Sequence, residues 1–226
     1  MILAIDTSTA TVSVALYDGT EILGESTYKS LNRHTVLLAP TVESLMKQTG
    51  TTFDKVTALA VALGPGSFTS LRVGLSFVKG IHAALQLPVI GIPTLSYFAA
   101  AQPASRATVC TLLTAGRGKF ATQFFEVKTN SVTAISEIDV HTIETLAATI
   151  VAPTVVTGEI TAETKTELKR SHNPNIRFST NGFGLRRAGF LAVQAWKRFR
   201  KGVFDEADTL TPIYLHTNDS ILNTRA

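Results

Sequence analysis

An almost wholly apolar run, Val56 to Leu63, is followed at once by Gly64-Pro65-Gly66 and then by a long segment with helical periodicity. A strand without polar alternation is typical of a sheet that is covered on both faces. Glycine and proline end such a strand in a sharp turn, and Ser67 or Thr69 can cap the helix that begins there. This unit of strand, turn and helix indicates an α/β protein.

The same order of elements occurs twice along the chain. Three strand-like runs with tight turns precede a helix, a strand and a second helix in residues 1–102, and the pattern begins again after the polar segment Gln102 to Arg106. A long amphipathic helix is expected at Leu185 to Lys201. We therefore predict two mixed-sheet lobes: an N-terminal lobe, 1–102, and a smaller, more divergent C-terminal lobe, 103–226, whose last segment can pack back on the first.

The composition indicates a folded protein without a membrane anchor. Hydrophobic residues make up 45% and charged residues 17% of the 226 residues, which is enough apolar material for buried cores. The N-terminus lacks the pattern of a signal peptide, and the longest apolar stretch, Val73 to Leu87, is interrupted by polar residues such as Lys79. A single cysteine, Cys110, excludes an internal disulfide and fits a reducing compartment. We expect a cytoplasmic protein.

The net charge of +4 is unevenly distributed, because the excess of basic residues lies after residue 100. Part of this excess could attract phosphates, and Arg198 and Lys201 are then candidate RNA contacts. The alternative is the solvated face of an amphipathic helix. The basic residues concerned are Arg186, Arg187, Lys197, Arg198, Arg200 and Lys201.

Two turns are candidates for a phosphate site. Asp6, Thr7 and Ser8 end the first strand, and a carboxylate beside hydroxyl groups could hold a magnesium ion and a phosphate. Alternatively, these side chains only satisfy the amides of the turn. Gly64, Gly66 and Ser67 precede a helix N-terminus that could receive an anion, or they form a rigid turn that packs the helix closely on its strand. Neither turn is a Walker A loop or a dinucleotide fingerprint.

The remaining motifs predict no complete active site. Gly116-Arg117-Gly118-Lys119 could cradle a phosphate, but a plain hairpin turn explains it as well. No histidine has a second histidine or a cysteine at metal-ligand spacing, and no Ser/His/Asp set is apparent. We therefore assign no catalytic residue and no metal ligand. The five histidines are His34, His82, His141, His172 and His216.

Three segments together resemble the TsaB (YeaZ) family. They are Ile2-Leu3-Ala4-Ile5-Asp6-Thr7-Ser8, the helix start from Arg33-His34 to Pro40, and the specific run from Gly64-Pro65-Gly66-Ser67-Phe68-Thr69 to Gly74, which Pro88 to Ser96 continues. The resemblance covers about residues 1–100. In the second half, only the order of elements and Thr157-Gly158-Glu159 are similar.

The resemblance implies the duplicated fold of actin, Hsp70 and sugar kinases, an actin-like ATPase (ribonuclease H-like) fold. It further implies a non-catalytic scaffold that binds and supports a TsaD-like catalytic subunit, together with a TsaE-like ATPase. That complex transfers a threonylcarbamoyl group to tRNA. We expect no cofactor on this chain alone, since ATP and metal would be held by the partner subunits, and tRNA would be reached through the complex.

The chain departs from its relatives at three places. TsaD relatives carry paired histidines on the first helix, whereas His34 to Thr41 holds one histidine here. Ser70 replaces a glycine, and Thr114 to Lys119 replaces an acidic Asp-Ala-Arg-Arg-Gly-Glu run. The loss of the paired histidines leaves metal catalysis without ligands, whereas the longer side chain of Ser70 can change how the helix N-terminus packs.

The first two helices have more apolar positions than one sheet face needs, and in the family these helices pack across the subunit interface. We therefore predict a partner interface there, with burial inside the monomer as the alternative, and a homodimer in isolation. The predicted interface residues are Leu38, Val42, Leu45, Met46, Leu71, Leu75, Val78 and His82.

The main rival function is a nucleotide-dependent phosphotransferase or ATPase that uses Asp6 and the turn from Gly64 to Ser67. A peptidase has no supporting residue set.

Overall fold

The first lobe is built on a five-stranded mixed sheet in the computed structural model, which describes residues 1–215. The strand order is β3-β2-β1-β4-β5, in which β1 to β3 pair antiparallel and β1, β4 and β5 pair parallel. The strands are β1 (Ile2–Asp6), β2 (Thr11–Tyr17), β3 (Ile22–Lys29), β4 (Ala58–Gly64) and β5 (Val89–Pro93).

Helices cover both faces of this sheet. Helices α1 (His34–Gln48) and α2 (Phe68–Leu85) pack on the outer face, and a short 3-10 turn, η1 (Phe53–Lys55), leads from α1 into β4. Helix α6 (Ala188–Phe199) packs on the other face. Strand β4, which lies between β1 and β5, is therefore buried on both sides, which explains why its sequence shows no polar alternation.

The second lobe repeats this sheet with the order β11-β10-β6-β7-β8, and β9 pairs with β7 off that path. Since β6, β7 and β8 are antiparallel neighbours and β6, β10 and β11 are parallel, the connectivity equals that of the first sheet. The predicted duplication is thus confirmed at the level of topology. The strands are β6 (Thr108–Gly116), β7 (Lys119–Lys128), β8 (Ser131–Ala134), β9 (Asp139–His141), β10 (Thr154–Gly158) and β11 (Ile176–Phe178).

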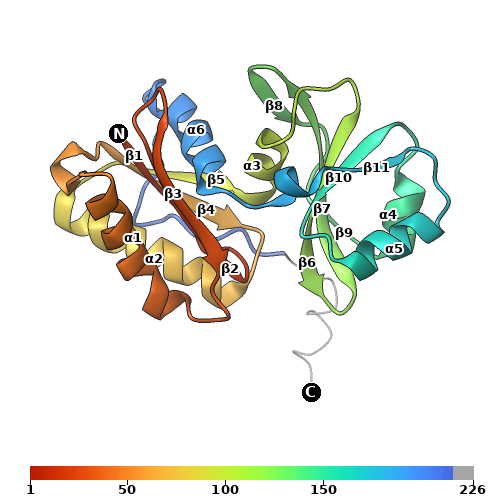
Figure 1. The fold of residues 1–226 in the computed structure, drawn as a ribbon, viewed down its shortest axis with the longest axis horizontal. Coiled ribbons are helices and arrows are strands. Elements are labelled where there is room, and N and C mark those ends of the chain that lie inside the picture. The colour runs from red at the N-terminus through yellow and green to blue at the C-terminus, as the bar shows by residue number, and fades with distance from the viewer. Residues whose placement is uncertain (216–226) are drawn as a thin grey trace.

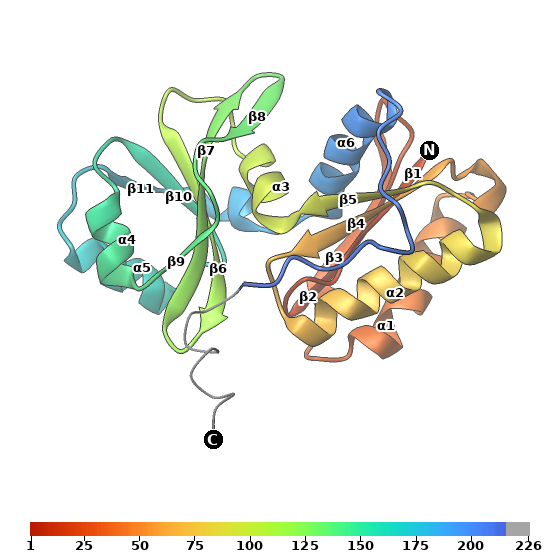
Figure 2. The ribbon, with the colours of Figure 1, turned by 180° about the vertical axis from the view of Figure 1, so that it is seen from behind.

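The two lobes exchange helices where they meet (Figures 1 and 2). Helix α3 (Thr94–Ala100) packs on the second sheet, whose opposite face is covered by α4 (Ile143–Thr149) and α5 (Ala162–Arg170). Helix α6 packs on the first sheet because its small apolar face, with Ala188 and Ala192, matches Ala4 and Ala15 across the interface. A division at residue 102 therefore separates the sheets but not the packed units, and residues 216–226 of the predicted second lobe lie outside the described residues.

No helix within residues 1–215 is long and apolar enough to cross a membrane. The apolar stretch Val73 to Leu87 falls mostly in α2, where Leu75 and Val78 are buried against the sheet. The apolar character of this segment is therefore explained by the core of the first lobe.

Candidate functional site at the lobe junction

The carboxylate of Asp6 is fully buried at the end of β1. Its Oδ1 accepts hydrogen bonds from the backbone amide and the hydroxyl of Ser8, both at 2.7 Å. This is the local turn arrangement that the sequence left open as an alternative to a magnesium site. It satisfies one carboxylate oxygen.

The other oxygen of Asp6 faces Arg186, which lies just before α6 and is 4% exposed. The guanidinium Nε lies 2.9 Å from Asp6 Oδ2, an ion pair that is not aligned as a hydrogen bond. Nη1 donates to Ser8 Oγ at 2.6 Å and Nη2 donates to the Thr11 carbonyl at 3.1 Å. Burial lowers the pKa of Arg186, but Asp6, Tyr97 and Glu159 together raise it above its ordinary value, so Arg186 stays charged.

Tyr97 of α3 completes the cluster by donating a hydrogen bond from its hydroxyl to Asp6 Oδ2. Burial, reinforced by the charge of Asp6, raises the pKa of Tyr97 well above its ordinary value, so the phenol keeps its proton. Both oxygens of Asp6 are therefore engaged by groups of the protein itself. A divalent cation, which requires several free oxygen ligands, does not fit this arrangement.

The glycine turn before α2 packs against the turn that contains Asp6. The Ser67 amide donates to the Ser8 carbonyl at 2.7 Å, and the Gly64 amide donates to Thr94 Oγ1 at 3.0 Å. Ser67 Oγ accepts from the Ser70 amide at 3.4 Å, so Ser67, rather than Thr69, caps this helix. The amides of Gly64 and Ser67 are thus satisfied within the protein, which favours the rigid packing turn over an anion site.

Thr7, in the turn after β1, fixes the first turns of α2 through its side-chain hydroxyl. Its hydroxyl donates to the Ser70 carbonyl at 2.6 Å and accepts from the Gly74 amide at 3.1 Å. A Cβ on Gly74 would lie 2.5 Å from Thr7 Oγ1. The glycine at position 74 is therefore explained by the close approach of α2 to the end of β1.

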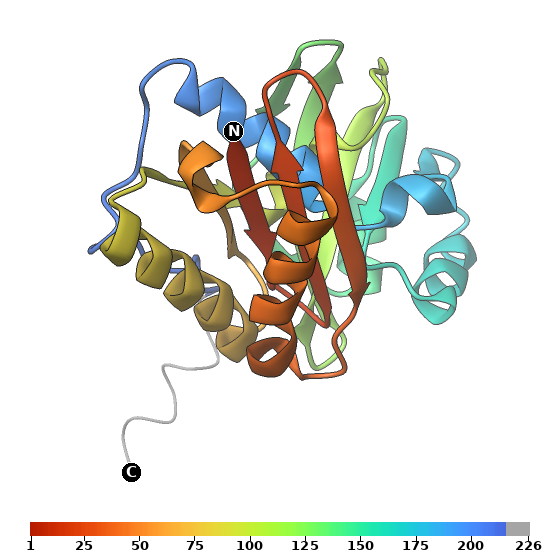
Figure 3. The same ribbon diagram turned by 60° about the vertical axis from the view of Figure 1, so that its left-hand side comes forward.

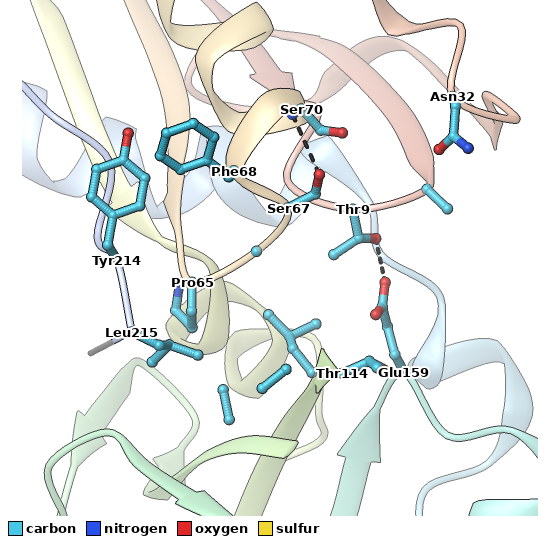
Figure 4. Close-up of a pocket in the computed structure, with 15 residues that line it drawn as sticks. Thr9, Asn32, Pro65, Ser67, Phe68, Ser70, Thr114, Glu159, Tyr214 and Leu215 are labelled. Atoms are coloured by element: carbon cyan, nitrogen blue, oxygen red, sulfur yellow. Dashed lines mark hydrogen bonds between the residues drawn. The ribbon is translucent and has the colours of Figure 1, made fainter. Parts of the chain in front are cut away.

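A cleft of about 740 Å³ opens between the lobes beside these turns (Figure 4). Phe68 and Tyr214 line one side, and Thr9 donates a hydrogen bond to Glu159 on the other. Among the described residues that line the cleft, Glu159 is the only one with a charged side chain. A carboxylate repels phosphate groups, and no lysine or arginine faces them here, so a polyphosphate nucleotide does not fit.

The histidines give no metal centre in the part of the chain that the structure describes, where no group of three or more His, Cys, Asp or Glu residues comes together. His34 is 3% exposed and its Nε2 lies 2.7 Å from the Thr9 carbonyl and 3.0 Å from Ser30 Oγ. It is satisfied as a buried polar group, with Ser70 Oγ 3.5 Å from its Nδ1. His216 lies outside the described residues. The segment from Gly116 to Lys119 forms the turn of the β6–β7 hairpin.

Seven of the eight predicted interface residues are buried within the first lobe, so the prediction that they form an open apolar stripe needs correction. Both apolar stripes face the sheet, because packing on the sheet removes more apolar surface from water than leaving them outside. His82 is half-buried, with Nδ1 2.7 Å from the Leu87 carbonyl. The buried residues are Leu38, Val42, Leu45, Met46, Leu71, Leu75 and Val78, each at most 6% exposed.

An apolar groove, named here the α1/α2 groove, lies along the same helices, and its lining includes Leu38, Val42 and Met46 of the predicted set together with side chains outside that set. Helices α1 and α2 lie side by side on the outer face of the first lobe (Figure 3), and two adjoining hollows of about 570 and 530 Å³ share Ala39 and Phe77. Phe68 is 54% exposed at the rim, beside Arg72 and Val73. The sequence pattern missed these positions because they lie off the main apolar stripe.

The basic C-terminal residues are largely paired within the molecule. Arg198 donates to the Gly91 carbonyl at 2.8 Å and to Asp205 Oδ1 at 2.9 Å, and Arg187 lies 2.6 Å from Glu25 Oε2. Arg198 therefore holds the segment after α6 against β5. This structural role was not part of the prediction that Arg198 contacts RNA. Lys201 is exposed.

Two equally connected sheets with helices exchanged at a central cleft define an actin-like, sugar-kinase-like fold. A ROK hexokinase from Thermus thermophilus shares this fold, with a TM-score of 0.52 and 11% identity over 89% of this chain and 99% of that one. Two chains from Pseudomonas aeruginosa are more similar. One is described as YeaZ (TM-score 0.78, 25% identity) and the other as an uncharacterized protein with similarity to peptidase YEAZ (TM-score 0.79, 24% identity); each match covers 95% of this chain and 99% of that one.

Sequence comparisons agree with the structural ones. The model of the TsaD family, described as tRNA N6-adenosine threonylcarbamoyltransferase, matches residues 21–219. The tRNA threonylcarbamoyladenosine biosynthesis protein TsaB of Escherichia coli is 40% identical over 95 residues, which cover 42% of this chain and 40% of that protein. TsaB of Bacillus subtilis is 29% identical over 127 residues, 56% of each chain. The matched segments thus span about half the length of these curated relatives or less. The chain belongs to the TsaD-related family of actin-like proteins, as a TsaB (YeaZ) member.

Proposed function

We propose that this chain is a non-catalytic subunit in the biosynthesis of threonylcarbamoyladenosine in tRNA, where it binds and supports a TsaD-like catalytic subunit. The names of its TsaB relatives support the pathway. The observation that carries the proposed role is the α1/α2 groove, an apolar surface that the monomer leaves open. Open apolar surfaces of this kind are typical of protein interfaces.

The α1/α2 groove has the features of a preorganised interface. The Arg72 guanidinium lies 3.6 Å from the centre of the Phe68 ring, and its Nε donates to the Tyr214 hydroxyl at 3.1 Å. The exposed aromatic ring is therefore held in place before a partner arrives, which lowers the entropic cost of binding. Aromatic and arginine anchors of this kind dominate binding energies at interfaces.

The polar junction supports the absence of catalysis by this chain alone. Asp6 is bound by Arg186, Tyr97 and Ser8, and the cleft presents Glu159 to any incoming phosphate. ATP, a metal ion and a TsaE-like ATPase would then act through the other subunits, and tRNA would be contacted in the complex. Calorimetric titration of the purified chain with magnesium and ATP is expected to show no binding; saturable binding would favour the phosphotransferase alternative.

The test of the interface uses two exposed alanines that lie on helices of different lobes. Ala39 lines both hollows of the α1/α2 groove, whereas Ala148 lies on α4 of the second lobe. Because a carboxylate in an apolar interface cannot be solvated, Ala39→Glu should weaken binding of the TsaD-like protein from the same source by roughly 100-fold or more. Ala148→Glu should bind like the parent protein. Affinity is measured by calorimetry, and thermal melts establish that both variants fold.

Unchanged affinity of a folded Ala39→Glu variant would show that the partner docks elsewhere. The same two proteins also test self-association, since an apolar groove can pair with a second copy when the partner is absent. Sedimentation should then give a dimer for the parent and for Ala148→Glu, and a monomer for Ala39→Glu.

A further inference from the structure

We infer that Arg186 is a built-in counter-ion that ties the two lobes together, so that a side chain, rather than a bound ligand, sets the geometry of the lobe junction. The inference goes beyond the proposed function and rests on other residues than the α1/α2 groove. It concerns the cluster of Asp6, Arg186 and Tyr97, whose charges the proposed interface does not use.

Both segments that cross between the lobes meet at the carboxylate of Asp6. One crossing contains α3, which supplies Tyr97, and the other returns from the second sheet through η2 (Asn181–Gly184) to Arg186 and α6. Asp6 itself ends β1, the central strand of the first sheet. One buried carboxylate therefore connects the first sheet to both crossings.

The geometry of Arg186 shows that it connects several segments of the chain in addition to neutralising the charge of Asp6. Its guanidinium contacts three residues, at Asp6 Oδ2, Ser8 Oγ and the Thr11 carbonyl, which lie at the end of β1, in the turn and at the start of β2. A fully buried ion pair contributes little net stability, since desolvation offsets the attraction, but it fixes its partners in one arrangement. The planar guanidinium is suited to this because its donors have fixed directions.

Further hydrogen bonds extend the tie into the second lobe. Gln102 Nε2 donates to Thr157 Oγ1 at 3.1 Å and to the Phe183 carbonyl at 2.9 Å, which connects the end of α3 with β10 and η2. Thr9 donates to Glu159 across the cleft. Polar side chains of both lobes thus bind the two crossing segments. Removal of the Arg186 charge should therefore loosen both segments, because they belong to one hydrogen-bond network.

The test is amide hydrogen exchange of the full chain with Arg186→Met, which keeps most of the side-chain volume and removes the charge. We expect exchange in residues 181–187 and 94–102 to rise at least about tenfold, while the interior of β6 and β10 exchanges as in the parent, because local opening raises exchange only where contacts are lost. Parent rates in both crossings would overturn the inference.

Two further variants separate a tie from charge neutralisation. Asp6→Asn combined with Arg186→Met removes the unpaired carboxylate, so it should recover much of the melting temperature lost in Arg186→Met while exchange in the crossings stays fast. Recovery of parent exchange rates in this double variant would show that Arg186 only balances a charge. Arg187→Met is the matched control, since Arg187 is paired with Glu25 at the first lobe, and it should leave exchange in residues 94–102 unchanged.

Discussion

The backbone of Gly66 approaches Ser8 so closely that a Cβ added to Gly66 would lie 2.1 Å from the Ser8 carbonyl oxygen. The neighbouring Ser67 amide donates to that same oxygen at 2.7 Å. Glycine is therefore required before α2 by contact with the turn after β1. Proximity of two protein segments, rather than a phosphate, explains the glycine at this position.

Gly66→Ala should lower the free energy of unfolding by about 1–3 kcal/mol, because the added methyl group meets backbone atoms that cannot move independently. Gly80→Ala is the matched control: nothing lies within 4 Å of a Cβ there, and Gly80 is a helical position in α2. That change should increase stability by up to about 1 kcal/mol. Chemical denaturation measures both, and equal effects of the two changes would contradict the packing argument.

Leu71→Ala should lower the free energy of unfolding by about 2–5 kcal/mol, since it removes a core side chain that is 1% exposed and leaves a cavity. Leu85, on the same helix, is 45% exposed, so Leu85→Ala should change stability by less than about 1 kcal/mol. If Leu71→Ala instead weakened partner binding without affecting the melt, its assignment to the core would be wrong.

Cys110 should resist alkylation in the folded protein. Burial raises the pKa of its thiol to about 12 from an ordinary 9.0, so the reactive thiolate is scarce and shielded. Iodoacetamide labelling followed by mass spectrometry is expected to show no modification at pH 9, and rapid modification in denaturant. Because the unfolded thiol ionises first, its contribution also makes stability fall as the pH rises from about 9 towards 12. Labelling of the native protein at a rate near that in denaturant would contradict this.

Arg198→Met should lower stability by about 1–2 kcal/mol, because it removes the hydrogen bond to the Gly91 carbonyl and leaves Asp205 without its cation. Lys201→Met, at an exposed position two residues past α6, should not change the melt. An RNA contact would behave differently: substitution of Arg198 would reduce RNA affinity and its salt dependence while the melt stayed the same.

Local patterns sufficed to predict most of the elements. Helix α1 (His34–Gln48) begins at the helix start that the sequence indicated, Arg33-His34, because a helix of four turns repeats its apolar period often enough to be recognised. Strands β9 and β11 were not predicted, since three residues are too few to show a period. The three-strand, helix, strand, helix order of each half also led directly to two equal topologies.

By itself, then, the sequence determined the elements, their order and the family, since periodicity, turn chemistry and motifs are properties of neighbouring residues. Only the tertiary structure decided which side of each apolar helix is covered, and it added the exposed residues Ala39 and Phe68 to the candidate interface. It also decided that Arg186, in a basic cluster late in the chain, neutralises Asp6 at the end of the first strand. Both outcomes depend on contacts between residues far apart in sequence, which a local pattern does not specify.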